Sequence, residues 1–506
     1  MPTTLELLFG LIAIIVALYY YYTSTFNFWK ERGVAGPKPY PIIGNLGRAL
    51  LGKVSTGDYL KELYDNPEYK NEPMIGIFIK KSPVLILKDL DMIKNVLIKD
   101  FSKICDRGVV TSPKVEPLSQ HLFSLEPKKW RPLRTRLSPI FTSGKLKEMF
   151  GLIIECADHY ENYLEKIVSR GEPIECRELT AKFTTDVIGS CAFGLEMNAI
   201  GDEDSEFRKM GRSVFEVSFL NILRNRIRNM APWLLNILIY FIRRDKVTAF
   251  FKGSIVNTIK YREDNNIYRN DFVNLLMELK KNPEKLNGIE LTDDLLAAQA
   301  FVFFLAGFET SSTTITHALY ELALNPTMQD KLRQEINELY EHNGEKLQYE
   351  DVKEMVYLDQ IFRETLRKYP PVTFLMRKTM TDYTFEHTKV TIPKDIKIWI
   401  PIYAIQRDPA IFSSPDVFKP ERFSDEMNKT RHAMTYLPFG DGPRNCIGSR
   451  FAVYQTKIGL IKTLRKFKVE ICDKTPIPYK NNPNTFILSP TEQIYLKFRK
   501  IDQDHI

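Results

Sequence analysis

Cysteine is scarce in this sequence, and the cysteines do not have the spacing of a metal-binding motif. The six cysteines are Cys105, Cys156, Cys176, Cys191, Cys446 and Cys472. No two of them form a CxxC pair and none clusters with histidine at zinc-site spacing, which excludes a zinc module of that kind. Six cysteines in 506 residues are also too few for a disulfide scaffold. The sequence therefore predicts a reducing compartment and free thiols.

The chain also lacks a long block of lysine or arginine, an internal repeat, and a flavin or dinucleotide fingerprint. Its formal net charge of +8 is spread along the chain. This distribution argues against nucleic-acid binding and favours an acidic partner protein or an anionic membrane surface. The length admits two subdomains or one unusually large domain.

Apolar runs in this sequence are short, except at the amino terminus. Residues 5–22, "LELLFGLIAIIVALYYYY", would form a helix of about 27 Å, close to the thickness of a bilayer core. Tyrosines 19–22 and Trp29 suit the membrane interface, and the following Lys30 and Arg32 place that side in the cytosol. A cleaved signal peptide is the alternative, but a basic start and a small-residue cleavage site are missing.

We therefore expect a membrane anchor over residues 1–29, a basic and proline-rich linker over 30–45, and a catalytic domain over 46–506. The prolines at 37, 39 and 41 favour a stiff, extended linker, with an ordinary loop as the alternative.

Apolar periodicity in the body predicts a mainly α architecture with a smaller β portion. Residues 73–88 indicate two strands around a Lys-Lys-Ser-Pro turn, and residues 383–402 indicate short strands. Helical spacing is typical of residues 144–169, 247–281, 327–341 and about 449–466. Residues 230–242, "MAPWLLNILIYFI", are too short to span a bilayer. They suit either a segment dipping into the membrane or a buried core helix.

The stretch "PFGDGPRNCIGSRFA", residues 438–452, surrounds Cys446 with three glycines. Glycine has the most backbone freedom to lose on folding, so its use here indicates unusual dihedrals or a close approach of the backbone. We interpret Cys446 as a ligand that binds a metal cofactor through its sulfur.

Residues 297–308, "AAQAFVFFLAGF", are apolar on all sides and predict a buried helix. The helix then runs into Glu309 and a Ser/Thr run that favours helix poorly. One interpretation is a groove for a small polar ligand. The other is a run of hydroxyls that bond back to the helix and bend it.

Two further pairs each allow a structural and a functional interpretation. Glu364 and Arg367 lie three residues apart on a predicted helix that must end at Pro370 and Pro371. They suit a solvated surface ion pair or, with Arg422, a buried charge network. Trp130 and Arg134 suit an anion clamp or amphipathic surface packing.

Together, these segments resemble the cytochrome P450 superfamily. Its haem-binding signature is matched by residues 439–448, its oxygen-binding helix by 306–310, its ExxR element by 364–367, its PERF element by 420–423 and its WxxxR element by 130–134. The signature, together with Asp106-Arg107-Gly108, is similar to insect microsomal family 6 members. The likeness covers nearly the whole chain and implies the cytochrome P450 fold preceded by a transmembrane helix.

The resemblance implies that Cys446 ligates the iron of haem b (iron protoporphyrin IX) as a thiolate, which favours O–O cleavage. Phe439 would shield the sulfur, and the haem carboxylates would be held by Arg444, Trp130, Arg134 and Arg377. On the other haem face, Ala306 and Gly307 would leave room for O2, Thr310 would hold the distal oxygen or a water, and Glu309 would feed protons. Glu364, Arg367 and Arg422 would stabilise the haem-binding core.

The implied activity is insertion of one oxygen atom from O2 into lipophilic substrates such as plant toxins or insecticides. Electrons would come from NADPH through NADPH–cytochrome P450 reductase, with cytochrome b5 as a further donor. The reductase would dock on the Cys446 face, at Lys128, Lys129, Arg131, Arg136 and Arg450. The implied location is the endoplasmic reticulum membrane, with the catalytic domain facing the cytosol.

Family-type substrate segments imply an apolar pocket wall formed by Val109, Phe123, Phe215, Phe219, Phe303, Val372, Phe374, Leu375 and Phe486. An endogenous lipid or hormone is the alternative substrate. A haem-thiolate isomerase or dehydratase would not need Glu309 and Thr310, and a haem-based sensor or carrier would not need an apolar pocket.

Overall fold

The computed structural model describes residues 4–111, 113, 116–202, 205–215, 246–286, 289–344 and 346–501. The apolar segment 230–242, Phe219 and the side chain of Phe215 lie outside the described residues. Three of the sequence predictions therefore have no structural description.

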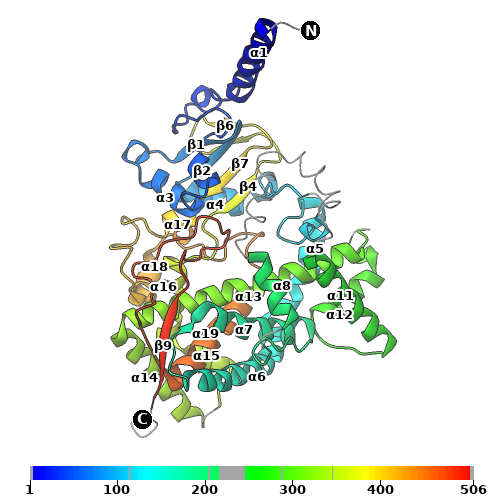
Figure 1. Ribbon diagram of the computed structural model, residues 1–506, viewed down its shortest axis with the longest axis vertical. Coiled ribbons are helices and arrows are strands. Elements are labelled where there is room, and N and C mark those ends of the chain that lie inside the picture. Colours follow the sequence, from blue (N-terminus) through cyan, green and yellow to red (C-terminus); the bar gives the residue numbers. More distant parts are fainter. Residues whose placement is uncertain are drawn as a thin grey trace.

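The amino-terminal helix α1 (Thr4–Thr23) projects away from the rest of the chain (Figure 1). None of its residues is buried, and its length and apolarity suit a membrane span. Among the described residues one other helix passes the same test of length and hydropathy, α13 (Asp293–Leu324), but its apolar window is 67% buried inside the protein. Helix α13 is therefore a core helix, as its sequence predicts.

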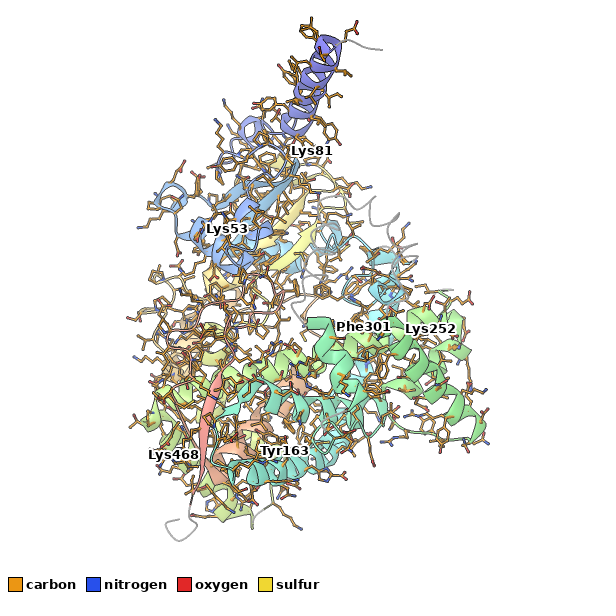
Figure 2. The ribbon with its side chains drawn as sticks, in the orientation of Figure 1. Lys53, Lys81, Tyr163, Lys252, Phe301 and Lys468 are labelled. Atoms are coloured by element: carbon orange, nitrogen blue, oxygen red, sulfur yellow. The ribbon has the colours of Figure 1, made fainter. Side chains whose placement is uncertain are left out.

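Trp29 does not lie where the sequence suggested. It is 3% exposed and packs against Gly76, and its indole N–H donates to the carbonyl of Ile77 at 2.9 Å. The buried carbonyl gives the indole a partner that the membrane interface would otherwise supply. The end of α1 instead meets Lys81, whose Nζ lies 3.5 Å from the ring centre of Tyr21. Figure 2 shows Lys81 where α1 joins the body.

The main sheet lies between α1 and the helical part of the molecule (Figure 1). It has the order β1-β2-β7-β4, formed by β1 (Met74–Ile79), β2 (Ser82–Leu87), β7 (Lys397–Ile400) and β4 (Leu375–Lys378). Strands β2 and β7 are parallel and the other neighbours antiparallel. The predicted pair of strands is confirmed, but the turn is shorter than expected, because Ser82 and Pro83 already pair with Ile79 and Phe78.

The described residues also form two smaller sheets. One has the order β3-β9-β8, formed by β3 (Ile174–Glu175), β9 (Tyr495–Lys500) and β8 (Phe467–Glu470). The other pairs β5 (Tyr383–Thr384) with β6 (Thr391–Ile392).

The larger part of the body is helical, which confirms the predicted mainly α class. Besides α1 and α13 the α-helices are α2 (Gly47–Leu50), α3 (Thr56–Asp65), α4 (Leu90–Lys94), α5 (Pro127–Leu137), α6 (Ser143–Val168), α7 (Cys176–Ile188), α8 (Glu206–Phe215), α11 (Lys246–Asp264), α12 (Phe272–Lys281), α14 (Pro326–Asn343), α15 (Tyr349–Glu354), α16 (Val356–Lys368), α17 (Ile402–Ile405), α18 (Asp425–Thr430) and α19 (Ser449–Lys466). Helix α13 packs against α7, α11, α16 and α19, so it forms the centre of the largest core.

The single helical stretch expected over 247–281 is two helices, α11 and α12. Asp271 separates them, because its side chain accepts the Asn274 N–H at 3.0 Å and caps α12. The same carboxylate pairs with the buried Arg262, with both oxygens 2.7 Å from guanidinium nitrogens. An aspartate that caps one helix and binds a residue of the other fixes the bend between them.

Helix α16 ends as predicted, at Lys368, two residues before Pro370. Its beginning is held from another helix, because the carboxylate of Glu335 in α14 accepts the N–H groups of Tyr357 and Leu358 at 2.8 and 2.9 Å. Both ends of the helix that carries Glu364 and Arg367 are therefore fixed.

Candidate functional site

The loop before α19 is folded tightly around Cys446. Gly440 and Gly442 both have left-handed backbones, with φ of 66° and 71°. A Cβ on Gly442 would lie 1.9 Å from the carbonyl oxygen of Leu97, so only glycine fits that contact. The Cys446 N–H donates to the Phe439 carbonyl at 2.8 Å and closes the loop. The glycines therefore bring the cysteine into a fixed turn against a neighbouring segment.

The Cys446 side chain has an exposed side. The protein groups packed around the sulfur desolvate it, and this desolvation is the main cause that raises the pKa of the thiol. The Gly448 N–H, Arg134 and Arg107 act in the opposite direction and favour the thiolate. The Phe439 ring stacks on Phe362, with ring centres 6.5 Å apart. The sulfur thus has an open side and neighbours that support a negative charge.

Four arginines from separate segments lie near this loop: Arg107, Arg134, Arg377 and Arg444. Arg134 donates to the carbonyl and side-chain oxygens of Asn445 at 2.9 and 2.8 Å, and Arg107 donates to the Arg444 carbonyl at 2.9 Å. The buried Nε of Arg377 and Nη1 of Arg444 have no hydrogen-bond partner. Within the described segments, none of the four arginines forms an ion pair with a carboxylate.

Burial is the main cause that lowers the pKa values of these arginines, and repulsion from the other arginines lowers the pKa values of Arg107 and Arg444 further. The pKa falls to about 10 for Arg377 and for Arg444, and well below the usual range for Arg107. Trp130 lies beneath this group, with its ring centre 4.0 Å from the Arg444 guanidinium carbon. Buried guanidinium groups that have unpartnered nitrogens and form no ion pair with a carboxylate call for an anionic ligand.

On α13, the side chain of Thr310 donates to the Ala306 carbonyl at 2.8 Å. The side chains of Ser312, Thr314 and Thr316 bond back to the helix in the same way. Back-bonding is therefore present, as one of the two sequence interpretations expected. Ala306 is exposed on this mostly buried helix. The missing Cβ of Gly307 is explained by packing, because it would lie 2.6 Å from the end of the Ile188 side chain in α7.

Glu309 is held away from the Thr310 hydroxyl. It is 3% exposed and forms a close ion pair with Arg177 of α7. Both residues line a polar cavity of about 410 Å³, together with Thr313 and His317. The buried Thr313 Oγ1 and His317 Nε2 have no protein partner. Such atoms in a polar cavity suit ordered water, so Glu309 lies at a water-accessible flank of α13.

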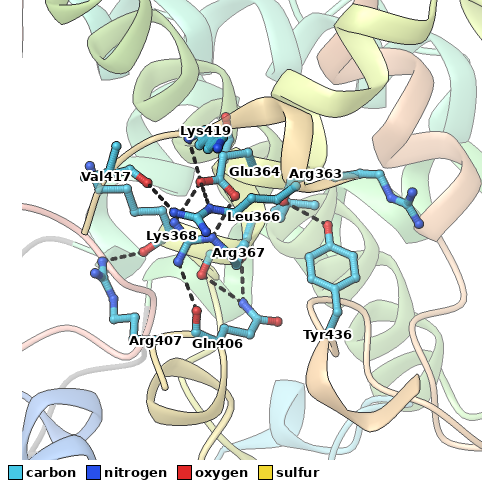
Figure 3. Close-up of polar contacts among 12 residues, drawn as sticks. Arg363, Glu364, Leu366, Arg367, Lys368, Gln406, Arg407, Val417, Lys419 and Tyr436 are labelled. Atoms are coloured by element: carbon cyan, nitrogen blue, oxygen red, sulfur yellow. Dashed lines mark hydrogen bonds and ion pairs between the residues drawn. The ribbon is translucent and has the colours of Figure 1, made fainter. Parts of the chain in front are cut away.

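Glu364 and Arg367 (Figure 3) form one buried network with Arg422. Arg367 donates from Nε and Nη2 to the two carboxylate oxygens of Glu364 at 2.7 and 2.8 Å, and Arg422 Nε lies 3.3 Å from Oε1. The Lys419 N–H also donates to Glu364, at 2.8 Å. Arg367 Nη1 donates to the carbonyl of Gln406, which directly follows α17. The network therefore ties α16 to the end of α17 and to the turn that precedes α18.

The expected pocket-wall residues divide into two groups. Phe123 and Phe486 make an edge contact with ring centres 6.5 Å apart, Phe374 packs on Trp399 at 4.6 Å, and Val109, Val372 and Leu375 are half-buried. Phe303 differs, since it is 7% exposed and packs between Phe141 and Phe272 at 5.2 and 4.2 Å. Phe303 is therefore a core residue, and its aromatic neighbours are sufficient reason for its burial.

Two residues of the site were not singled out from the sequence: Arg107 and Arg177. Arg107 was visible only as the middle of Asp106-Arg107-Gly108, and nothing local marks Arg177.

A comparison with known families gives one match over most of the chain. The Cytochrome P450 family model matches residues 34–498. The chain belongs to the cytochrome P450 family. As a cytochrome P450 it is a monooxygenase with haem iron as its cofactor, and the family implies redox partners and a lipophilic substrate. The two unpartnered arginine nitrogens fit the two carboxylates of a haem.

Insect cytochrome P450 proteins of family 6 are similar over nearly the full length. Cytochrome P450 6a2 of Drosophila melanogaster is 41% identical, covering 98% of this chain and 99% of its own length. Cytochrome P450 6A1 of Musca domestica is 40% identical, covering 95% of each chain. Cytochrome P450 6k1 of Blattella germanica is 39% identical, covering 97% of this chain and 96% of its own. These comparisons confirm the resemblance to insect family 6.

Proposed function

We propose that this cytochrome P450 is a membrane-anchored haem-thiolate monooxygenase that oxidises lipophilic foreign compounds such as plant toxins and insecticides. The observation that carries this proposal is the open Cys446 sulfur beside buried arginines that have no carboxylate partner. The exposed, apolar α1 supports anchoring in the endoplasmic reticulum membrane, with the catalytic domain in the cytosol. The monooxygenase activity itself rests on the family match over residues 34–498.

In this proposal Cys446 ligates haem b and Arg377, Arg444, Arg107 and Arg134 neutralise its carboxylates. When bound, the haem supplies activation of O2 with electrons from NADPH. Trp130 supports the Arg444 guanidinium by its ring face, and Phe439 limits water at the sulfur. The chain's own contribution is thus an anionic sulfur ligand and a cationic clamp.

Proton supply is assigned to Thr310 and Glu309. The Thr310 hydroxyl lies beside the exposed Ala306, so it can hold a proton or a water on that face. Glu309 faces the polar cavity on the neighbouring flank, where its carboxylate can exchange protons with water once its pairing with Arg177 loosens. The two groups would act in series through water, since they do not contact each other directly in the described structure.

NADPH–cytochrome P450 reductase is the proposed electron donor, with cytochrome b5 as a further one. Lys128, Lys129 and Arg131 are exposed on α5, and Arg450 is exposed at the start of α19, directly after the cysteine loop. Positive side chains on these two helices suit an acidic partner. Arg136 is also exposed, but its Nε is engaged by the Lys285 carbonyl at 3.0 Å.

The experiment that tests the function combines the purified full chain with the reductase, NADPH and a substrate panel. Plant toxins and insecticides form one arm of the panel, and fatty acids and steroid hormones form the other. We expect NADPH-dependent products that carry one added oxygen atom, detected by mass, in the first arm. Products in the second arm alone would instead favour an endogenous role. No product in either arm, from a protein with an intact CO spectrum, would contradict the proposal.

Replacing Thr310 with alanine tests the proton assignment. We expect the haem and CO spectrum to be retained, with product per NADPH falling about tenfold or more and hydrogen peroxide rising, because general acid assistance is typically worth about 10²- to 10⁴-fold. The matched control is Thr314→Ala, which removes an equally back-bonded hydroxyl one turn further along α13. If both variants couple NADPH to product as the wild type does, Thr310 has no role in proton supply.

A further inference from the structure

Gln299 joins the core helix α13 to a distant loop through its side-chain amide. Its Oε1 accepts the Leu122 N–H at 2.8 Å, and its Nε2 donates to the Gln120 carbonyl at 2.8 Å. The same nitrogen also donates to the Leu295 carbonyl of its own helix at 3.0 Å. The Gln299 side chain is fully buried. Both ends of the amide are therefore used, and two of the three bonds hold the loop.

The loop has a second anchor on the side of the arginine group. Arg107 donates from Nη1 to the Phe123 carbonyl at 2.8 Å, and its guanidinium carbon lies 4.2 Å from the Phe123 ring centre. Its Nη2 donates to the Arg444 carbonyl in the cysteine loop. Residues 120–123 are thus fixed at one end to α13 and at the other to the cysteine loop.

The position of Gln299 on α13 relates this clamp to the candidate site. Gln299 precedes Ala306 by seven residues, which is about two helical turns, so the two side chains lie on the same face. The loop held by Gln299 leads directly to Phe123, which contacts Phe486. A segment fixed above one face of α13 therefore places Phe123 relative to Ala306 and Thr310.

The glutamine side chain satisfies backbone groups of the loop that an apolar residue could not. An apolar residue would suit the buried position, but it would leave the buried Leu122 N–H and the Gln120 carbonyl without partners. The residues between the one-turn helix Pro117–Ser119 and α5 contain no regular secondary structure, so side chains must fix their course.

We propose that Gln299 is a positioning residue that sets the size selectivity of the substrate pocket by holding Phe123 in place. The proposal rests on the proposed function, because it takes the space beside Ala306 and Thr310 as the substrate pocket. If the loop were released, a ligand that contacts Phe123 would have to order the loop on binding, and this entropy cost would weaken its affinity. The affinity of a small ligand that does not reach Phe123 would stay the same.

The first test is hydrogen–deuterium exchange of the full chain in the wild type and in Gln299→Leu. We expect peptides covering residues 116–126 to exchange about tenfold faster in the variant, because two hydrogen bonds that hold the loop are lost. The matched control is Gln329→Leu, another fully buried glutamine, which bonds to Leu322 and Val469 instead. It is expected to destabilise the protein without changing exchange at 116–126.

The second test compares two azoles that bind haem iron, imidazole and the bulkier 1-phenylimidazole, by spectral titration. In Gln299→Leu the Kd of 1-phenylimidazole is expected to rise about five- to tenfold, while that of imidazole stays the same. Gln329→Leu is expected to change neither Kd. Gln299→Glu keeps an acceptor for the Leu122 N–H, so its Kd should lie between those of the wild type and Gln299→Leu.

Unchanged exchange at 116–126 in Gln299→Leu, or an equal change in the Kd of both azoles, would overturn the proposal. Should Gln299→Leu fail to fold, Gln299→Glu decides by the same two measurements. Failure of the proposed function has a separate signature, because the wild type would then give no oxygenated product in the substrate panel, while the exchange experiment would still report on the clamp.

Discussion

Replacing Cys446 with alanine is expected to abolish monooxygenase activity and the CO spectrum typical of thiolate-ligated haem. Alanine removes the sulfur that the proposal assigns as the iron ligand, and no other described cysteine occupies this loop. Haem content after purification and the spectrum of the reduced, CO-treated protein measure the effect. The loss is expected to be complete, since no step of the proposed reaction proceeds without the ligand.

Cys472→Ala is the matched control for this experiment. Cys472 is a half-buried free thiol whose sulfur contacts the Tyr495 carbonyl at 3.5 Å, at the edge of the small β3-β9-β8 sheet. Its variant is expected to keep haem, the CO spectrum and activity. A Cys446→Ala protein that retained the thiolate-type spectrum would refute the ligand assignment and the proposed function with it.

The second large effect is expected for Glu364→Gln, which removes the charge at the centre of the Arg367–Arg422 network. Breaking a buried ion pair by neutralising one partner typically costs about 3–5 kcal/mol, because the other charge stays buried without compensation. Here two arginines lose their carboxylate. We expect the urea midpoint of unfolding to fall sharply and little haem-loaded protein to be recovered.

Glu148→Gln provides the control, because Glu148 also forms an i,i+3 ion pair within a helix, with Lys145 at 2.8 Å. That pair is largely exposed, and exposed pairs contribute only about 0.2–1 kcal/mol. Equal shifts of the urea midpoint in the two variants would show that the Glu364 network does not carry the stability assigned to it.

Local patterns were sufficient to predict much of the fold. The apolar run that became α1, the all-round apolar sequence of α13 and the prolines that end α16 each act within a few residues. The glycines around Cys446 also indicated unusual dihedrals, since Gly440 and Gly442 both have left-handed backbones. Predictions of this kind depend on backbone geometry, which a short segment determines by itself.

Contacts between distant segments could not be predicted in the same way. The Arg177–Glu309 pair, the Arg107–Arg444 contact and the Gln299–Leu122 bond each join residues more than a hundred positions apart. Trp29 was misplaced for the same reason, because a tryptophan next to a membrane helix suits the interface unless a distant strand offers it a buried partner. The hydrogen-bond partner of such a side chain is determined by the tertiary arrangement and not by its neighbours in the sequence.

The guanidinium groups of Arg107, Arg377 and Arg444 lie close together, so the stability of the folded chain is expected to depend on bound porphyrin. Like charges confined together oppose compaction, and a dianionic guest that binds only the folded chain shifts the folding balance by mass action. A cell or an expression host that makes this polypeptide faster than it makes porphyrin is therefore expected to lose the surplus to proteolysis and aggregation. Yield would then be limited by tetrapyrrole synthesis rather than by translation.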